Sequence, residues 1–314
     1  MELDFSDFEI LILPDEEFDS AVSCQLSHAC RQAGAFSKDY VAKSIKVIPT
    51  GKVSPAEKRD IALKYAKGEI LAFIDDDAYP RKDWLKNAMK NFSDLQVAAV
   101  GGPAITAKED NLRQRASGLV YASALTSGAY NYRYIPKPKR EVDDYPTCNL
   151  LVRKSLMQEL GGFDTKLWPG EDTKLCRDIT KKLSKKIIYD PQVLVWHHRR
   201  PLFLLHLKQV AGFALHRGYF TKRFSETSLR LSYFIPSLFL FALITGGIFS
   251  LVFRPLRPIY SSGLFLYFII ILISSISKEL QVLFFVTIGK ILTHITYGFY
   301  FLKGLLSSKL REER

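Results

Sequence analysis

The sequence predicts an α/β domain followed by a membrane-associated C-terminal third. Short apolar runs of strand length alternate with helix-like segments in the first half of the 314 residues. The last third instead contains uncharged apolar stretches of about 20 residues, which is the length that crosses a bilayer. The charge divides at the same place, because residues 199–314 hold 15 Lys and Arg against 4 Asp and Glu, whereas residues 1–198 hold 29 against 28.

Four apolar runs and one well-marked helix start support the α/β prediction. Ser54 can cap a helix in which Pro55 occupies the first turn and Glu57 stands three residues after the cap, and we expect that helix to end at Gly68. Strands that alternate with helices indicate a mostly parallel sheet, which binds ligands at the carboxyl ends of its strands. The expected strands are Phe8–Leu13, Val41–Ile48, Ile70–Ile74 and Val97–Val100.

Two stretches of the C-terminal third are long and apolar enough to span a membrane. They cover Tyr233–Phe253 and Ile259–Ser277. A third candidate, Leu280–Leu302, is weaker because it contains Lys290 and His294. We therefore expect two or three transmembrane helices, and the sequence leaves open whether the third crosses the bilayer or lies on it.

A basic segment, residues 199–230, links the two parts. It holds seven Lys and Arg against one Glu226, and its apolar residues recur at helical spacing, as in a helix that lies in the membrane interface. A helix packed on the preceding domain is the alternative, and both can hold together. The expected organisation is an α/β domain over 1–198, this interfacial segment, and a transmembrane region over 231–314.

Charge and composition also bear on location and partners. Because the basic excess lies in the apolar third, it favours an anionic membrane surface over nucleic acid. Basic residues beside the first span and an N-terminus without signal-peptide character predict a multi-pass protein of the inner or plasma membrane whose first domain is cytoplasmic. None of the four cysteines (Cys24, Cys30, Cys148 and Cys176) forms a C-x-x-C pair, which is typical of small buried side chains in a reducing compartment.

Three adjacent carboxylates, Asp75, Asp76 and Asp77, directly follow the apolar run that ends at Ile74. They repel one another unless a cation lies between them, and oxygen ligands suit Mg²⁺ or Mn²⁺. In an extended chain Asp75 and Asp77 point to one side and Asp76 to the other. The alternative is a solvated acidic turn.

Two further groups could carry chemistry. Gly170-Glu171-Asp172 precedes a helix-like run, so its acids either cap that helix or include a general base. His197-His198-Arg199-Arg200 follows a strand-like run, and here a histidine could bind metal while the arginines bind phosphate or anchor the chain at the membrane interface.

Together these blocks resemble the inverting glycosyltransferases of family 2. The matching segments are Ala66–Asp77, preceded by Lys58-Arg59-Asp60, then Thr147–Arg153, Gly161–Asp164 and Gly170–Leu175. Each motif alone is common, but their order and spacing agree over roughly residues 8–200. The resemblance implies a GT-A fold, which is a Rossmann-like domain that binds a nucleotide sugar.

The resemblance also implies roles for individual residues. Asp77 would bind the divalent cation, Asp75 would face the nucleotide and could share the metal, and His197 or His198 would supply a further ligand. Asp172, with Glu171 beside it, would be the catalytic base. Nucleotide or diphosphate contacts are expected from Asp75, Asp76, Arg59, Pro14, Asp15, Arg199 and Arg200, and sugar or acceptor contacts from Asn149, Trp168, Gly170 and Gln209.

The expected reaction is transfer of a sugar from a nucleotide-sugar donor to a hydroxyl of a membrane-associated acceptor, either lipid-linked or a surface glycan. A polyprenyl-phosphate acceptor is the alternative, and a non-catalytic membrane scaffold is a second one. The family pattern is incomplete at Pro49-Thr50-Gly51, where an acidic residue often reads the base, so the nucleotide is not predicted. Polymer synthases of this family carry Gln-x-x-Arg-Trp after the base, and the residues that follow Gln209 do not match this pattern. The mismatch favours addition of a single sugar.

Overall fold

The computed structural model describes residues 3–17 and 44–311, and these form two compact units. The first unit contains the chain up to Ala104 together with residues 136–197. The second contains residues 105–135 and the chain from His198 onward. The first unit ends at His197, beside the boundary expected at 198, and residues 105–135 group with the C-terminal helices instead of with the rest of 1–198. The roles expected for the parts stay predictions.

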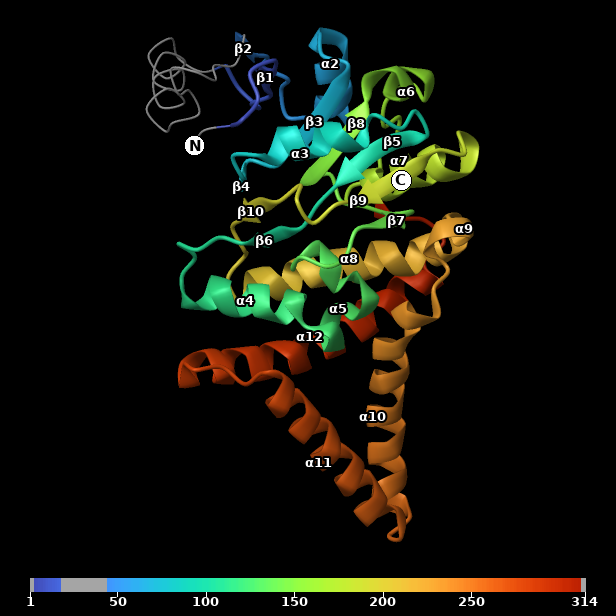
Figure 1. The fold of residues 1–314 in the computed structure, drawn as a ribbon. Helices are drawn as coiled ribbons and strands as arrows, with labels where there is room; N and C mark the ends of the chain where they lie inside the picture. The colour runs from blue at the N-terminus through green and yellow to red at the C-terminus, as the bar shows by residue number, and fades with distance from the viewer. Residues whose placement is uncertain (1–2, 18–43, 312–314) are drawn as a thin grey trace. The chain divides into compact units, whose positions relative to one another are not determined.

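A mixed sheet forms the centre of the first unit, and among the described residues its strand order is β3-β8-β5-β9-β7 (Figure 1). Strand β5 is buried along its whole length, as its continuous apolar run predicts for a central strand. The strands are β3 (Ile70–Ile74), β8 (Asn149–Arg153), β5 (Val97–Gly101), β9 (Lys186–Tyr189) and β7 (Arg140–Val142).

The α/β class is confirmed, but this sheet is mixed and not mostly parallel. Strand β5 pairs in parallel with β9, whereas β8 is antiparallel to both β3 and β5, and β7 is antiparallel to β9. The reason is the insertion of β8, which runs opposite to its neighbours between the two strands that the N-terminal half supplies. An apolar run buried on both faces reads alike in either direction, so its sequence does not reveal this orientation.

Two smaller strand pairs complete the described part of the first unit. Strand β1 (Glu9–Ile12) is parallel to β2 (Ser44–Val47), which confirms both expected strands as far as they are described, since residues 41–43 lie outside the described part. Strand β4 (Ala78–Pro80) is antiparallel to β10 (Val195–His197).

Helix α2 (Pro55–Tyr65) begins as the sequence predicts. The Ser54 hydroxyl accepts a hydrogen bond from the Glu57 backbone N–H, and the Glu57 carboxylate accepts one from the Ser54 backbone N–H. The helix ends at Tyr65, three residues before Gly68. The other helices of this unit are α3 (Trp84–Asn91), α6 (Lys154–Glu159) and α7 (Glu171–Arg177), and α7 continues as a π-turn over Asp178–Lys182.

The core of the first unit lies between α3 and the sheet. Trp84 of α3 and Phe92, which directly follows that helix, pack with Val100 of β5, Leu151 of β8 and Val195 of β10, all of which are buried. Burial of a large apolar side chain contributes about 1.5–3 kcal/mol each. This packing fixes β10 near the strands that lead to the acidic triplet.

The second unit is helical. After strand β6 (Ala104–Thr106), where the chain leaves the first unit, it contains α4 (Leu112–Ala122), α5 (Ala124–Ser127), α8 (Leu204–Arg223), α9 (Ser225–Ser228), α10 (Ile235–Val252), α11 (Leu256–Ser274) and α12 (Leu280–Leu306) (Figure 1). Short 3₁₀ turns cover Gly128–Arg133 and Leu231–Phe234.

The structure confirms helices over the three expected apolar stretches and over the basic segment. In the described part of the chain, three helices are long and apolar enough to cross a membrane: Leu231–Val252, Leu256–Ser274 and Leu280–Leu306. Helix α8 occupies the centre of the basic segment and presents Lys208, Lys222 and Arg223 on its exposed side.

Candidate active site

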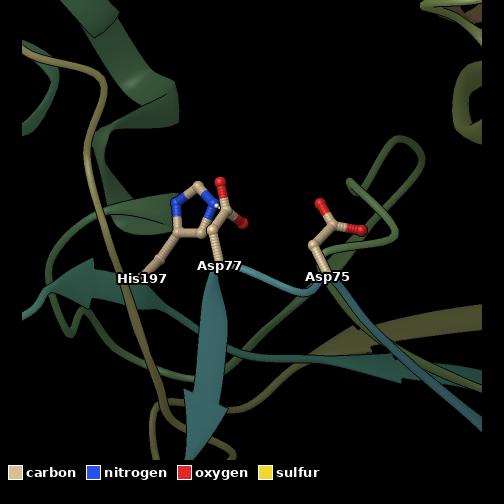
Figure 2. A group of neighbouring side chains, drawn as sticks. All are labelled: Asp75, Asp77 and His197. Carbon is tan, nitrogen blue, oxygen red and sulfur yellow. Dashed lines mark hydrogen bonds and ion pairs between the residues drawn. The ribbon is translucent and has the colours of Figure 1, made fainter. Parts of the chain in front are cut away.

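Two carboxylates of the acidic triplet meet a histidine at one end of the sheet. Ligand atoms of Asp75, Asp77 and His197 all lie within 4.8 Å of one another. Figure 2 shows the Asp77 carboxylate facing the His197 ring, with Asp75 beside them. Asp76 is exposed and does not belong to this group, as strand alternation predicts.

Strand pairing explains why His197 reaches the aspartates across 120 residues. Asp75–Asp77 form the turn between β3 and β4, and the antiparallel register of β4 with β10 places His197 opposite Ala78. The Nε2 atom of His197 then lies 2.9 Å from an Asp77 carboxylate oxygen. Two carboxylates and an imidazole are ligands that Mn²⁺ accepts, and Mg²⁺ prefers the oxygens, so the residues present fit a divalent cation.

Arg59 of α2 joins the aspartates to a second acidic group. Its guanidinium donates hydrogen bonds to Asp75 over 3.2 Å and to Glu171 over 2.7 Å. Burial raises the pKa of the Asp75 carboxyl above its usual range, while Arg59 opposes that rise and Asp77 adds to it. Arg59 therefore holds together two carboxylates that would otherwise repel each other.

Glu171 and Asp172 occupy the first turn of α7, where the helix dipole favours negative charge. Glu171 is buried, and its second carboxylate oxygen accepts a hydrogen bond from the Gly170 backbone N–H. Asp172 is partly exposed, and its carboxylate accepts one from the Thr173 backbone N–H. Of the two acids, Asp172 is thus the one whose carboxylate remains partly accessible to a ligand.

Asp60 holds the loop that leads toward α7, a role that sequence reasoning missed. Its carboxylate accepts hydrogen bonds from the backbone N–H groups of Phe163 and Asp164. Burial raises the pKa of Asp60, although these two bonds oppose the rise. Gly162 has φ +88°, and a Cβ there would lie 2.3 Å from an Asp60 oxygen. The signal available in the sequence was the Gly161-Gly162 pair within a turn-rich block.

The two adjacent histidines have different partners. His197 joins the aspartates in the first unit, whereas His198 belongs to the second unit, where its Nδ1 lies 2.6 Å from an oxygen of Asp110. The other Asp110 oxygen accepts a hydrogen bond from the Arg199 backbone N–H. This geometry selects His197 as the candidate metal ligand, a choice that the sequence left open.

Asn149 has structural partners on all sides, and its expected sugar or acceptor contact stays a prediction. Its side chain is fully buried in β8 and donates hydrogen bonds to the carbonyl oxygens of Gly102 and Val193. Its own oxygen accepts one from the Trp84 indole N–H over 2.8 Å. Asn149 therefore ties α3 to two buried segments. A buried amide side chain needs hydrogen-bond partners, and these segments supply them.

The other expected ligand contacts stay predictions. Trp168 is about half exposed in the loop before α7, and Gly170 is the N-cap residue of that helix. Asp15 forms an ion pair with Lys58, and the Pro14 carbonyl accepts a hydrogen bond from the Thr50 backbone N–H over 3.0 Å. In the second unit, Gln209 accepts a hydrogen bond from Tyr121, Arg199 is buried, and Arg200 is exposed.

Comparison with known proteins shows which family part of the sequence resembles. Residues 32–161 match the family described as glycosyl transferase family 2. The pre-mycofactocin glycosyltransferase of Mycobacterium tuberculosis is 30% identical over 146 residues, which cover 46% of this chain and 30% of that protein. The glycosyltransferase AglE of Haloferax volcanii is 24% identical over 151 residues, covering 48% of this chain and 46% of that protein. The chain thus spans less than half the length of either relative.

Solved structures show a more distant likeness. A crystal structure of GalNAc-T7 with UDP, GalNAc and Mn²⁺ has a TM-score of 0.43 and 15% identity over 71% of this chain and 45% of that one. For S. aureus TarS the TM-score is 0.40, with 16% identity over 68% and 35% of the two chains. The sequence match covers less than half of the chain, and within it residues 32–161 are similar to glycosyltransferase family 2.

Proposed function

We propose that this protein is an inverting glycosyltransferase that moves a sugar from a nucleotide-sugar donor to a hydroxyl group of a membrane-associated acceptor. The observation that carries the proposal is the group of Asp75, Asp77 and His197 at the end of β3, joined through Arg59 to the start of α7. Similarity to proteins named glycosyltransferases supports the reaction class.

The first half of the site would bind the donor. Asp77, Asp75 and His197 would hold Mg²⁺ or Mn²⁺, which, when bound, neutralises negative charge on the departing nucleoside diphosphate. Arg59 keeps Asp75 beside Glu171 in the absence of that charge. With a cation on the aspartates, Arg59 would still compensate the charge of the buried Glu171.

The second half would act on the acceptor. Asp172 is the partly exposed acid of α7, and a carboxylate in this place can accept the proton of the attacking hydroxyl as the sugar is transferred with inversion. Glu171 is buried and bound to Arg59, so it positions the turn and does not accept that proton. The exposed Trp168 ring offers a flat apolar face for a sugar beside this turn.

The apolar helices support an acceptor that is delivered at a membrane. Three described helices have the length and composition to span one. We place the first unit on the cytoplasmic side, because basic residues flank the start of α10.

The test is release of nucleoside diphosphate from a panel of nucleotide sugars by the full chain in detergent, with Mn²⁺, with Mg²⁺ and with chelator. We expect release from at least one donor, only with metal, and loss of about three orders of magnitude in Asp172→Asn. If Asp172→Asn keeps most of its rate, the acceptor is a phosphate, such as polyprenyl phosphate, which needs no base. If no donor binds by calorimetry with or without Mn²⁺, the chain is a scaffold and the proposal fails.

A further inference from the structure

The three apolar helices of the second unit differ in how they are packed. Helices α10 and α11 are mostly exposed: only 11% and 6% of their most apolar stretch is buried. In α12, by contrast, 44% of the corresponding stretch is buried. Helices α10 and α11 contact each other near their turn, where the Tyr260 hydroxyl donates to the Leu243 carbonyl. Figure 1 shows this turn at the far end of the hairpin from α12. Their 18 and 19 residues correspond to about 27–29 Å of helix, close to the hydrocarbon thickness of a bilayer.

Helix α12 packs beside α8 over the length of α8, and the two run in the same direction. Near the start, the side chain of Leu202 lies 3.0 Å from the position of a Cβ on Gly289, and His206 Nε2 lies 3.0 Å from the Thr293 hydroxyl. Near the end, the Lys222 ammonium donates to the Ser307 carbonyl over 2.8 Å. Backbone also meets backbone directly at two glycines, Gly218 against Phe301 and Gly304 against Leu215.

Helix α8 is too polar to cross a bilayer. It contains Lys208, Arg217, Lys222 and Arg223 within 20 residues, and charged side chains inside the hydrocarbon region are strongly disfavoured. A helix that lies along α8 for this distance must occupy the same depth. This packing argues against a membrane-spanning α12, despite its apolar composition.

Contacts at the ends of the hairpin agree with this placement. The Ser237 hydroxyl, in the first turn of α10, donates to the Gly298 carbonyl of α12 over 2.9 Å. The Lys290 ammonium of α12 donates to the carbonyl of Ser274, the last residue of α11, over 2.7 Å. One helix thus contacts both the beginning of α10 and the end of α11, which lie on the same membrane face if the hairpin crosses.

We propose that α10 and α11 alone cross the membrane, as a hairpin, and that α12 lies with α8 in the headgroup layer of the face from which the hairpin enters. The partner of this two-helix layer is an anionic lipid surface. Exposed apolar side chains such as Leu204, Phe213, Phe284 and Phe299 would enter the interface, while Lys208, Lys222, Arg223 and Lys303 would meet lipid phosphates.

The experiment is protease protection of a short epitope tag in sealed membrane vesicles that contain the full chain. Three versions carry the tag before Met1, in the turn between Arg254 and Pro258, or after Leu310. We expect the first and third tags to be cleaved together and the second to have the opposite accessibility. The readout requires no sugar transfer, so it is independent of the proposed function.

Two outcomes would overturn the proposal. If the tag after Leu310 shares the accessibility of the turn tag, α12 crosses the membrane. If all three tags share one accessibility, the hairpin does not cross. Arg115→Ala in α4 tests whether a contact at the start of α12 sets its position, because it removes the ion pair between Arg115 and Glu279. Because α12 is held by α8, the tag after Leu310 should keep its side in that variant.

Discussion

Arg59 and Glu171 form a hydrogen-bonded ion pair of 2.7 Å that joins helices 112 residues apart in the sequence. Both side chains are largely buried, and the second guanidinium nitrogen bonds Asp75. Loss of one partner of such a pair leaves an uncompensated charge, which costs more than the pair itself contributes.

We predict that Arg59→Met lowers the free energy of unfolding by about 3 kcal/mol, because Glu171 then remains buried without its cation. Urea denaturation in detergent measures this. The matched control is Lys58→Met on the same helix, whose ion pair with the half-exposed Asp15 should contribute less than about 1 kcal/mol. Equal losses in the two variants would contradict the role of Arg59 as a buried bridge.

Removal of the imidazole beside Asp77 should weaken metal binding. We expect His197→Ala to lower Mn²⁺ affinity by about 10–100-fold, as loss of a ligand or a ligand's partner does elsewhere. Titration calorimetry with Mn²⁺ alone measures this without any sugar transfer. The neighbouring His198→Ala is the control, because His198 pairs with Asp110 and should leave the affinity unchanged. A larger loss of Mn²⁺ affinity in His198→Ala than in His197→Ala would show that the metal binds His198 instead.

Adjacent glycines separate backbone strain from a side-chain clash. Gly161 and Gly162 both have positive φ, +75° and +88°, so alanine is strained at either position by about 1–2 kcal/mol. A Cβ at Gly161 meets nothing within 4 Å, whereas one at Gly162 meets the Asp60 carboxylate at 2.3 Å. We therefore expect Gly162→Ala to be less stable than Gly161→Ala by a further 1–3 kcal/mol, roughly.

That difference is measured by urea denaturation of the two variants side by side. It should shrink in the background Asp60→Ala, since the atoms that the new methyl group meets are then absent. A difference that persists in this background would show that Asp60 does not fill the space beside Gly162.

Acid should destabilise the second unit through His206. Burial lowers the pKa of this imidazole to about 4, from an ordinary value near 6.5, while its nitrogens bond Ser117 and Thr293. The folded state therefore holds the neutral form, and the unfolded state takes up the proton first. This contribution to stability is complete above about pH 6.5 and is lost as the pH falls toward 4, by about 3 kcal/mol in total.

The measurement is the free energy of unfolding from pH 7 to pH 4.5, compared between the natural chain and His206→Gln. The glutamine variant should be less stable at pH 7 and should show a smaller loss toward acid, so that the two curves converge. Parallel curves would mean that His206 is not buried in its neutral form.

Local features of the fold and site could be predicted from the sequence. Strand β3 and the aspartates after it are contiguous, so an apolar run followed by acids gives both the strand end and the candidate ligands. The Ser54–Glu57 cap is equally local, and it is present as expected. The long apolar stretches predict helices for the same reason, because length and composition suffice.

Features that depend on distant pairing could not be predicted in this way. The choice of His197 over His198 follows from the register of β10 with β4, and two adjacent histidines look alike until that register is known. The burial of Asn149 follows from the position of β8 inside the sheet. Likewise, nothing in residues 105–135 themselves shows that they pack with helices that begin at position 204.

The pairing of β4 with β10 also has a consequence for synthesis of the chain. The aspartates leave the ribosome early, but the histidine that completes their group is the last residue of the first unit, 120 positions later. Domains generally fold as units during translation, the N-terminal one first. The candidate metal-binding group is therefore completed only 38 residues before Ile235, where the first apolar helix begins. A truncated chain that ends before Val195 would keep the acidic triplet but not its imidazole, which makes metal affinity a direct reporter of how much of the first unit has been made.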